Sequence, residues 1–506
     1  MHEIPYTSTT VSPDARARDL RSFWRWVLAL VAPLPFLALA VNMWVLPFDL
    51  RADLPALISG IAQHPERTEA GLWLSLVFVL FAVPAVIAVA WSSRRSAPWL
   101  SLTGGVIGIV AFAEAGTGAG TELLAFIGVT HHLTAAQIVG VSEAIAEHPG
   151  GQIGVPILVI GQAVSLVLLG IALWRSPLAP TWMGAVLAIS GPAHLLIPGG
   201  NAGAGGSWLL TAVGCVGASI ALLRTSNASF DLAPENARVP PTDDDEPPLP
   251  TPSLRTRTSS TRTPSVTTTH LDSRTGWRIL LAITAPIAAV AIAIFRFLLP
   301  YNTPDDPDVI FDKLLANPGF QSAAIWLGPF LAPMVVTGVL AVAWVSRRRA
   351  PLLTTIGTVL AFLGFTALVA GGSLADLITY ATSDGAIDRK LGYQVASAAQ
   401  ATPQSVVLGS VFVFGHLIGT VILGIALWRS RAVNWTFAVA LTISQPIHLV
   451  SAMTGNHPLD LVGWGLTAVG FGAAGWKLLH TTNDRFDLPP IAMRHVPSPK
   501  AIAARP

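Results

Sequence analysis

The chain has 506 residues, of which 52% are hydrophobic and only 11% are charged. Soluble domains carry roughly 25% charged residues, so this composition excludes an ordinary soluble protein. Several uninterrupted apolar runs exceed about 18 residues, the length at which a run is read as a membrane-spanning helix. The strands of a membrane β-barrel would instead be short and would alternate in polarity. The sequence therefore predicts an all-α integral membrane protein.

The formal net charge is +2, and the chain has one cysteine. That cysteine, Cys215, lies in an apolar stretch. A single cysteine excludes an internal disulfide and a cysteine-based metal cluster. We interpret Cys215 as a small core residue.

Twelve membrane spans are predicted, six in each half of the chain. The first half, residues 23–225, holds spans at about 24–46, 71–91, 99–117, 154–174, 179–197 and 206–223. The second half, residues 277–480, holds spans at about 278–299, 323–345, 352–371, 405–428, 434–452 and 460–478. Polar tails at 1–22 and 481–506 flank the two halves. Residues 226–276 are rich in Pro, Ser, Thr and charge, which predicts a disordered linker.

The two halves resemble each other in sequence. Residues 170–196 and 424–450 both contain Gly-Ile-Ala-Leu-Trp-Arg-Ser, followed by an apolar run with a Pro and a His at matching places. Trp24-Arg25 with Pro33 recurs as Trp277-Arg278 with Pro286, and both halves close with Phe-Asp-Leu at 230–232 and 486–488. An even number of spans in each half gives both halves the same orientation, which is a parallel repeat.

Short basic turns separate several of the predicted spans. They contain Arg94-Arg95, Arg175, Arg347-Arg348-Arg349 and Arg429. With the N-terminus inside the cell, all of these turns lie on the cytosolic side, as the positive-inside rule requires. The sequence therefore predicts a multi-pass plasma-membrane protein with both termini and the linker in the cytosol.

Two outer loops of the first half, 48–70 and 118–153, are each predicted to hold a short amphipathic helix. Each loop ends in His-Pro before the next span, at His64-Pro65 and His148-Pro149, and the second half has Asn317-Pro318 and Thr402-Pro403. Proline fits the first turn of a helix, because the N–H that it lacks would be unpaired there.

Polar side chains inside predicted spans are the candidates for function, because burying them in a bilayer is costly. Five such residues lie roughly 18–24 Å above the inner face of a core about 30 Å thick, at 1.5 Å per helical residue. They are Glu114, Gln162, His194, His416 and His448. Gln162 and His416 occupy matching places in the two halves, as do His194 and His448. Asn201 and Asn456 also match and are minor candidates for lining an outer mouth.

Three interpretations of these residues remain open. As a transport site, Glu114 and the histidines would bind a cation or relay protons. In a membrane redox subunit the site would bind haem b or a quinone, and for haem b His416 and His448 would be the axial ligands, on consecutive helices at similar depth. In the third interpretation the polar groups only join packed helices, with Ser190 and Ser444 pairing with the histidines four residues later. No ligand spacing predicts a metal site.

The plan of two six-span halves, a cytosolic linker and two cytosolic ends is similar to that of the major facilitator superfamily of transporters. The turn between spans two and three of that superfamily combines glycine and aspartate with basic residues. Here Ser92-Ser93-Arg94-Arg95 and Ser346-Arg347-Arg348-Arg349 have the basic residues only. The resemblance implies movement of a small solute or ion with proton coupling. Neither an enzymatic reaction nor a nucleic-acid partner is expected.

Overall fold

The computed structural model describes residues 19–49, 51–197, 199–235, 272–371 and 373–491. Every regular element in these residues is a helix. The residues before the gap at 236–271 are called the first half below, and those after it the second half. The predicted linker lies mostly in that gap, and most of both predicted tails also lies outside the described residues.

The first half contains eleven α-helices and one 3-10 helix in the described residues. They are α1 (Arg21–Val31), α2 (Leu34–Val45), α3 (Leu54–Gln63), α4 (Pro65–Ser93), α5 (Pro98–Ala113), η1 (Glu114–Ala119), α6 (Gly120–Thr130), α7 (Ala135–Ala146), α8 (Pro149–Trp174), α9 (Thr181–Leu196), α10 (Gly200–Arg224) and α11 (Asn227–Phe230).

The second half contains eleven α-helices in the described residues. They are α12 (Ser273–Thr284), α13 (Ile287–Phe297), α14 (Pro307–Leu315), α15 (Pro318–Ser346), α16 (Pro351–Gly371), α17 (Ser373–Ser383), α18 (Arg389–Ala401), α19 (Pro403–Ser430), α20 (Trp435–Thr454), α21 (His457–Leu479) and α22 (Asn483–Phe486).

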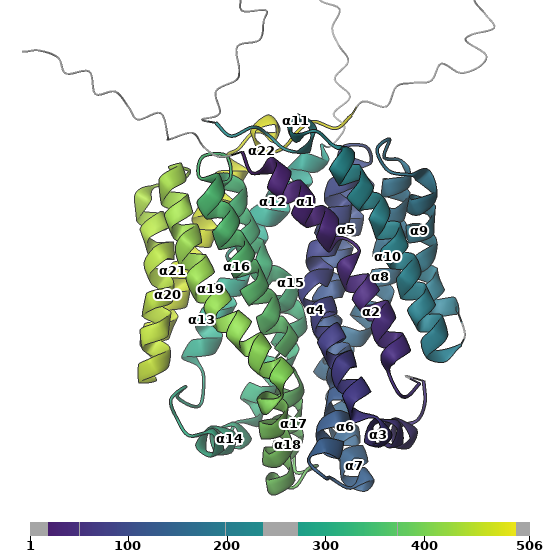
Figure 1. Ribbon diagram of the computed structural model, residues 1–506. Coiled ribbons are helices and arrows are strands. Elements are labelled where there is room, and N and C mark those ends of the chain that lie inside the picture. Colours follow the sequence, from purple (N-terminus) through teal and green to yellow (C-terminus); the bar gives the residue numbers. More distant parts are fainter. Residues whose placement is uncertain (1–18, 50, 198, 236–271, 372, 492–506) are drawn as a thin grey trace, which may run out of the picture.

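Long helices of the two halves form two groups that stand side by side (Figure 1). The short helices α3, α6, α7, α14, α17 and α18 lie at one end of these groups, and α11 and α22 lie at the other. Large apolar side chains face outward along the long helices: Ile160 is 63% exposed and Phe414 is 64% exposed. A monomeric soluble protein rarely exposes so much contiguous apolar surface.

Nine segments of the described chain are long and apolar enough to cross a membrane. They are Arg21–Val45, Pro65–Ser93, Pro98–Thr130, Pro149–Trp174, Gly200–Arg224, Ser273–Phe297, Pro351–Leu368, Pro403–Ser430 and Trp435–Thr454. Helix α15 has two parts, Pro318–Leu331 and Pro333–Ser346, which are bent by 47° relative to each other. If these two parts form one span, they are a tenth such segment. These segments suggest a multi-pass membrane protein. Of the twelve predicted spans, α9 is apolar but shorter, and α21 is not among these segments.

Prolines mark helix boundaries, as the sequence predicts. Helices α4, α8, α15 and α19 all begin at the proline that follows His64, His148, Asn317 or Thr402. The predicted spans 24–46 and 278–299 are each divided into two helices beside Pro33 and Pro286. Proline lacks the N–H that would continue the helical hydrogen bonds, which accounts for the break.

The outer loop 118–153 contains two helices, α6 and α7, where the sequence predicts one. The left-handed backbone of His132, with φ of 58°, turns the chain after α6. Thr134 then starts α7, because its hydroxyl accepts from the Gln137 N–H at 3.2 Å while the Gln137 side chain accepts from the Thr134 N–H at 2.9 Å. This reciprocal capping box fixes a new helix start.

An apolar core at the end with the short helices joins the two halves. Its buried residues come from α6 and α7 of the first half and from α14, α17 and α18 of the second, and they include Leu124, Ile127, Val141, Phe311, Ile378 and Val395. We call this cluster the cap core. Because both halves contribute to it, separating them at this end would expose its apolar surface.

Two reciprocal ion pairs join the halves at the opposite end. Arg94, after α4, donates to Asp487 of the second half at 2.8 and 3.0 Å. Arg347, after α15, donates to Asp231 of the first half at 2.9 and 3.1 Å. We call these two pairs the clasp. Each aspartate belongs to a Phe-Asp-Leu segment, so the closing segment of each half binds the basic turn of the other.

Each clasp arginine also makes contacts within its own half. Arg94 donates to the Phe230 carbonyl at 2.6 Å, and Arg347 donates to the Phe486 carbonyl at 2.9 Å. The guanidinium groups lie 3.5 and 4.3 Å from the ring centres of Trp91 and Trp344, which meet each other edge to face. Cation–π contact and bidentate pairing together fix both arginines.

Candidate functional site

Asp460 is the most deeply buried carboxylate of the ion pairs in the second half, with 2% of its surface exposed. His448 Nδ1 lies 2.5 Å from Asp460 Oδ1, and Arg296 Nε donates to Asp460 Oδ2 at 2.6 Å. Arg296 continues outward and donates to the Thr303 hydroxyl at 3.0 Å. We call Arg296, Asp460 and His448 the ionic chain. Helices α13, α20 and α21 each supply one of its members.

A second histidine lies beside the ionic chain. The ring centre of His416 is 5.7 Å from that of His448, and the Trp464 ring packs against both imidazoles at 6.0 and 5.2 Å. His416 Nδ1 is 2.6 Å from the Phe412 carbonyl oxygen, so this nitrogen carries a hydrogen and donates it. In the described part of the chain, His416 Nε2 and Trp464 Nε1 are buried without a protein hydrogen-bond partner. Buried polar atoms of this kind mark places for water or a ligand.

The corresponding region of the first half has no ionic chain. His194 Nε2 is 3.1 Å from the Thr211 hydroxyl, and its ring lies 4.1 Å from that of Trp208. Counting forward from the repeated Trp-Arg segments places Met43 opposite Arg296, and counting back from the repeated Leu-Thr-Ala-Val-Gly segments places Ala204 opposite Asp460. At the matching sequence positions, the first half has a histidine and a tryptophan but neither charge.

The other predicted residues take different positions. Gln162 is buried on α8 with 5% exposure, and Glu114 is buried with 2% exposure where α5 meets η1. The element η1 packs against α16 of the second half, so Glu114 lies near the contact between the halves. Of the predicted site residues, His416 and His448 are the pair that the structure brings into ring contact.

Asn201 and Asn456 stabilise the backbone at helix starts. Asn456 caps α21 by accepting from the Leu459 N–H at 3.0 Å, and Asn201 donates to the Phe48 carbonyl. The predicted pairs of Ser190 and Ser444 with the histidines do not form. Each serine hydroxyl instead donates to the carbonyl three residues earlier in its own helix, at 2.8 Å.

Arg296 and Asp460 are not among the site residues predicted from the sequence. Both fall inside predicted spans, 278–299 and 460–478, so the signal of a charge in an apolar segment was present. Because they lie at the outer ends of those spans, they do not stand out as charges within an apolar run. Their pairing with each other and with His448 depends on how α13, α20 and α21 pack.

Glycines let α19 approach α16 closely enough to place His416. A Cβ atom on Gly364 would lie 2.4 Å from the backbone nitrogen of His416, and one on Gly415 would lie 2.7 Å from the carbonyl oxygen of Leu360. Real Cβ atoms do not approach backbone this closely, so a larger residue at either position would force the helices apart.

We expect Gly364→Ala to lower the free energy of unfolding by about 1–3 kcal/mol, because overpacking shifts the backbone of α19. Gly409→Ala is the matched control, since a Cβ there meets nothing within 4 Å and alanine favours a helix. Thermal unfolding of the purified variants measures both effects. Equal melting temperatures for the two variants would show that the helices tolerate separation at His416.

A small cavity lies where α4 and α5 of the first half meet α15 and α16 of the second. The cavity there has a volume of about 20 Å³ and is lined mainly by apolar residues, including Val83, Phe112 and Val336. A space of this size holds about one water molecule.

Within the described residues, no group of three or more His, Cys, Asp or Glu side chains is placed to hold a metal ion. The candidate site consists of the ionic chain together with His416 and Trp464.

No known family, characterised protein or solved structure matches this chain.

Proposed function

We propose that the protein is a plasma-membrane protein with twelve spans, built from two similar six-span halves of the same orientation. The proposal adds α9 and α21 to the ten segments described above, because each packs along a long apolar neighbour, α9 on α8 and α21 on α20. The clasp end carries the basic turns, so we place it in the cytosol together with both ends of the chain. The short helices of the cap core then lie outside.

Within this arrangement, we infer that the second half carries a proton-binding site of a transporter for a small solute or ion. The single observation behind this inference is that Asp460, 2% exposed, lies against both His448 and Arg296. Ionisable groups within a membrane span are costly, and in such proteins they mark ion pathways and proton relays.

Each residue has a distinct part in the proposed site. Arg296 provides a permanent positive charge that keeps Asp460 ionised, because arginine does not lose its proton in proteins. Asp460 orients the His448 ring by accepting from Nδ1, which leaves Nε2 to take up a proton. His416 lies beside it as a second acceptor, with Nε2 available. Proton movement between the two rings would be linked to solute movement through a change in the packing of α19 and α20.

Proton flux in liposomes tests the proposed site. We expect His448→Ala to lower solute-dependent proton flux by at least about tenfold, the scale on which a positioned proton-transfer group acts. His194→Ala is the matched control, because that histidine occupies the same place in the first half without a charged partner. If both variants keep the wild-type flux, or both lose it equally, the ionic chain is not the coupling site.

A non-transporting structural or partner-binding membrane protein is the second candidate. The observation in its favour is that the halves are joined at both ends, by the clasp and by the cap core. It predicts no flux with any solute. The haem b alternative remains a prediction for His416 and His448. A porphyrin between those rings would need Trp464, which packs against both, to move; a Soret band in haem-supplemented protein would support it.

A further inference from the structure

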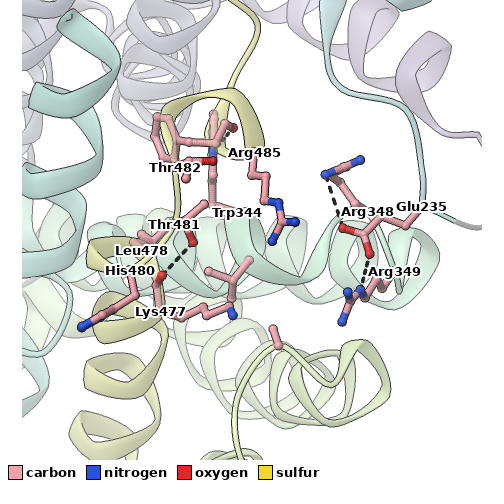
Figure 2. Close-up of a pocket in the computed structure, with 13 residues that line it drawn as sticks. Glu235, Trp344, Arg348, Arg349, Lys477, Leu478, His480, Thr481, Thr482 and Arg485 are labelled. Carbon is pink, nitrogen blue, oxygen red and sulfur yellow. Dashed lines mark hydrogen bonds and ion pairs between the residues drawn. The ribbon is translucent and has the colours of Figure 1, made fainter.

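A basic pocket lies at the clasp end, beside α15, α21 and α22 of the second half. Its volume is about 140 Å³. Four cationic side chains line it, Arg348, Arg349, Lys477 and Arg485, together with one carboxylate, Glu235. Figure 2 shows Arg485 between Lys477 on one side and the group of Arg348, Glu235 and Arg349 on the other.

The charges in this pocket are unbalanced. Glu235 pairs with Arg348 at 3.3 Å and also with Arg349. Lys477 and Arg485 form no ion pair with any residue that the structure describes. A single carboxylate therefore faces four positive charges, and two of those charges have no acidic partner of their own within the described chain.

The first half provides an internal comparison. Glu235 N donates to the Arg348 carbonyl at 3.0 Å, and Ile491 N donates to the Arg95 carbonyl at 2.8 Å, so the two chain segments run over equivalent turns. Counting from the two Phe-Asp-Leu segments and the two basic turns, the first half has Ala221 in place of Lys477, Ser229 in place of Arg485 and Ser96 in place of Arg349. The same local fold thus forms without these cations, and structural necessity does not explain them.

The side chains of Thr482, His480 and Trp476 show which groups are available in the pocket and at what level of the membrane it lies. Thr482, which also lines it, precedes α22 without making a side-chain cap, so its hydroxyl is not used by that helix. The His480 ring turns away toward Trp476, with Nδ1 2.9 Å from the Trp476 carbonyl oxygen. Trp476 is 66% exposed. Exposed tryptophans gather at the boundary between a membrane and water, which places the pocket at the level of lipid headgroups.

We propose that this pocket binds a phosphate monoester, carried either by an anionic lipid headgroup or by a soluble phosphorylated molecule. Arginine guanidinium groups match phosphate oxygens in bidentate geometry, and a lysine adds a compact charge. Basic pockets between spans on the cytosolic side of membrane proteins bind phosphorylated headgroups. Glu235 competes with the ligand for Arg348 and Arg349. The inference is independent of the transport site, which lies among other residues.

Isothermal titration of the purified full-length protein in neutral detergent tests the proposal. The probes are inorganic phosphate and a short-chain phosphatidylinositol 4-phosphate, with short-chain phosphatidylcholine as the uncharged reference. We expect the double variant Lys477→Ala/Arg485→Ser to bind at least about tenfold more weakly, the loss expected when charge-assisted hydrogen bonds are removed. Arg429→Ala removes an exposed arginine near the same end, outside the pocket, and should bind as the wild type does.

Glu235→Gln provides a second, opposite test, because removal of the competing carboxylate should tighten binding several-fold. Binding of the phosphorylated lipid alone would identify a headgroup site, and binding of inorganic phosphate as well would identify a soluble source. The proposal is overturned if the wild type binds neither probe, or if the wild type and the double variant bind equally. Should the double variant not fold, failure of Glu235→Gln to tighten binding overturns it as well.

Discussion

Asp460→Ala is expected to destabilise the protein by about 3–5 kcal/mol, the cost of removing one partner from a buried ion pair. The carboxylate is 2% exposed and lies against both Arg296 and His448, so its loss leaves the Arg296 guanidinium, 21% exposed, without its counter-charge. If the ionic chain binds protons, the same variant should also lose solute-dependent proton flux. Thermal unfolding in detergent and flux in liposomes measure the two effects separately.

A double variant distinguishes the structural role of the ionic chain from a functional one. Arg296→Met with Asp460→Ala gives the second half the residues that the first half has at Met43 and Ala204. Replacing both members of a buried pair by apolar residues is often neutral for stability. We therefore expect the melting temperature to return toward the wild-type value while proton flux stays lost. Recovery of flux together with stability would mean that the pair serves packing alone.

Arg347→Met is expected to have the second largest effect, a loss of about 3 kcal/mol, because it leaves Asp231 without its bidentate partner. The side chains of this pair are 17% and 13% exposed. Arg94→Met should cost a similar amount, because Arg94 and Asp487 form the reciprocal pair with 10% and 8% exposure. Chemical unfolding of the single and double variants measures both costs. A cost near zero for either single variant would mean that its pair does not hold the halves together.

The clasp also predicts how stability depends on acid. Burial acts to raise the pKa of Asp231, but the charges of Arg347 and Arg94 and the hydrogen bonds from Arg347 and the Leu232 N–H together outweigh it, so that pKa lies below its ordinary value. A lowered pKa in the folded protein stabilises the fold above the ordinary aspartate value of about 3.9, and this contribution is lost as the pH falls through the folded value. Melting temperatures of wild type and Asp231→Asn should therefore differ at pH 7, begin to converge as the pH falls below about 4, and meet only below the lowered pKa of the folded protein.

Apolar run length was sufficient to predict most of the long helices. Proline positions predicted where α4, α8, α15 and α19 begin, because the geometry of proline acts locally. The division of loop 118–153 into α6 and α7 depends on the Thr134 capping box, whose Thr and Gln, three residues apart, are visible in the sequence. Secondary structure was thus predictable where local chemistry determines it.

Contacts between distant segments were less predictable. Both basic turns and both Phe-Asp-Leu segments are visible as repeats, yet the sequence does not reveal that Arg94 pairs with Asp487 rather than with Asp231 of its own half. This pairing between the two halves depends on how the two helix groups pack side by side. His416 and His448 could be placed at one depth from helical rise alone, whereas the link from His448 through Asp460 to Arg296 required the packing of three helices.

The claim that the chain spans a membrane with the clasp and the cap core on opposite faces is tested most directly by cysteine labelling in intact cells. Cys215 is fully buried and does not compete for the reagent. Ala136→Cys on α7 and Ala228→Cys on α11 each introduce an exposed thiol, one at each end. We predict that an impermeant maleimide labels position 136 on intact cells and position 228 only after permeabilisation. Labelling of both positions from the same side would contradict the proposed arrangement.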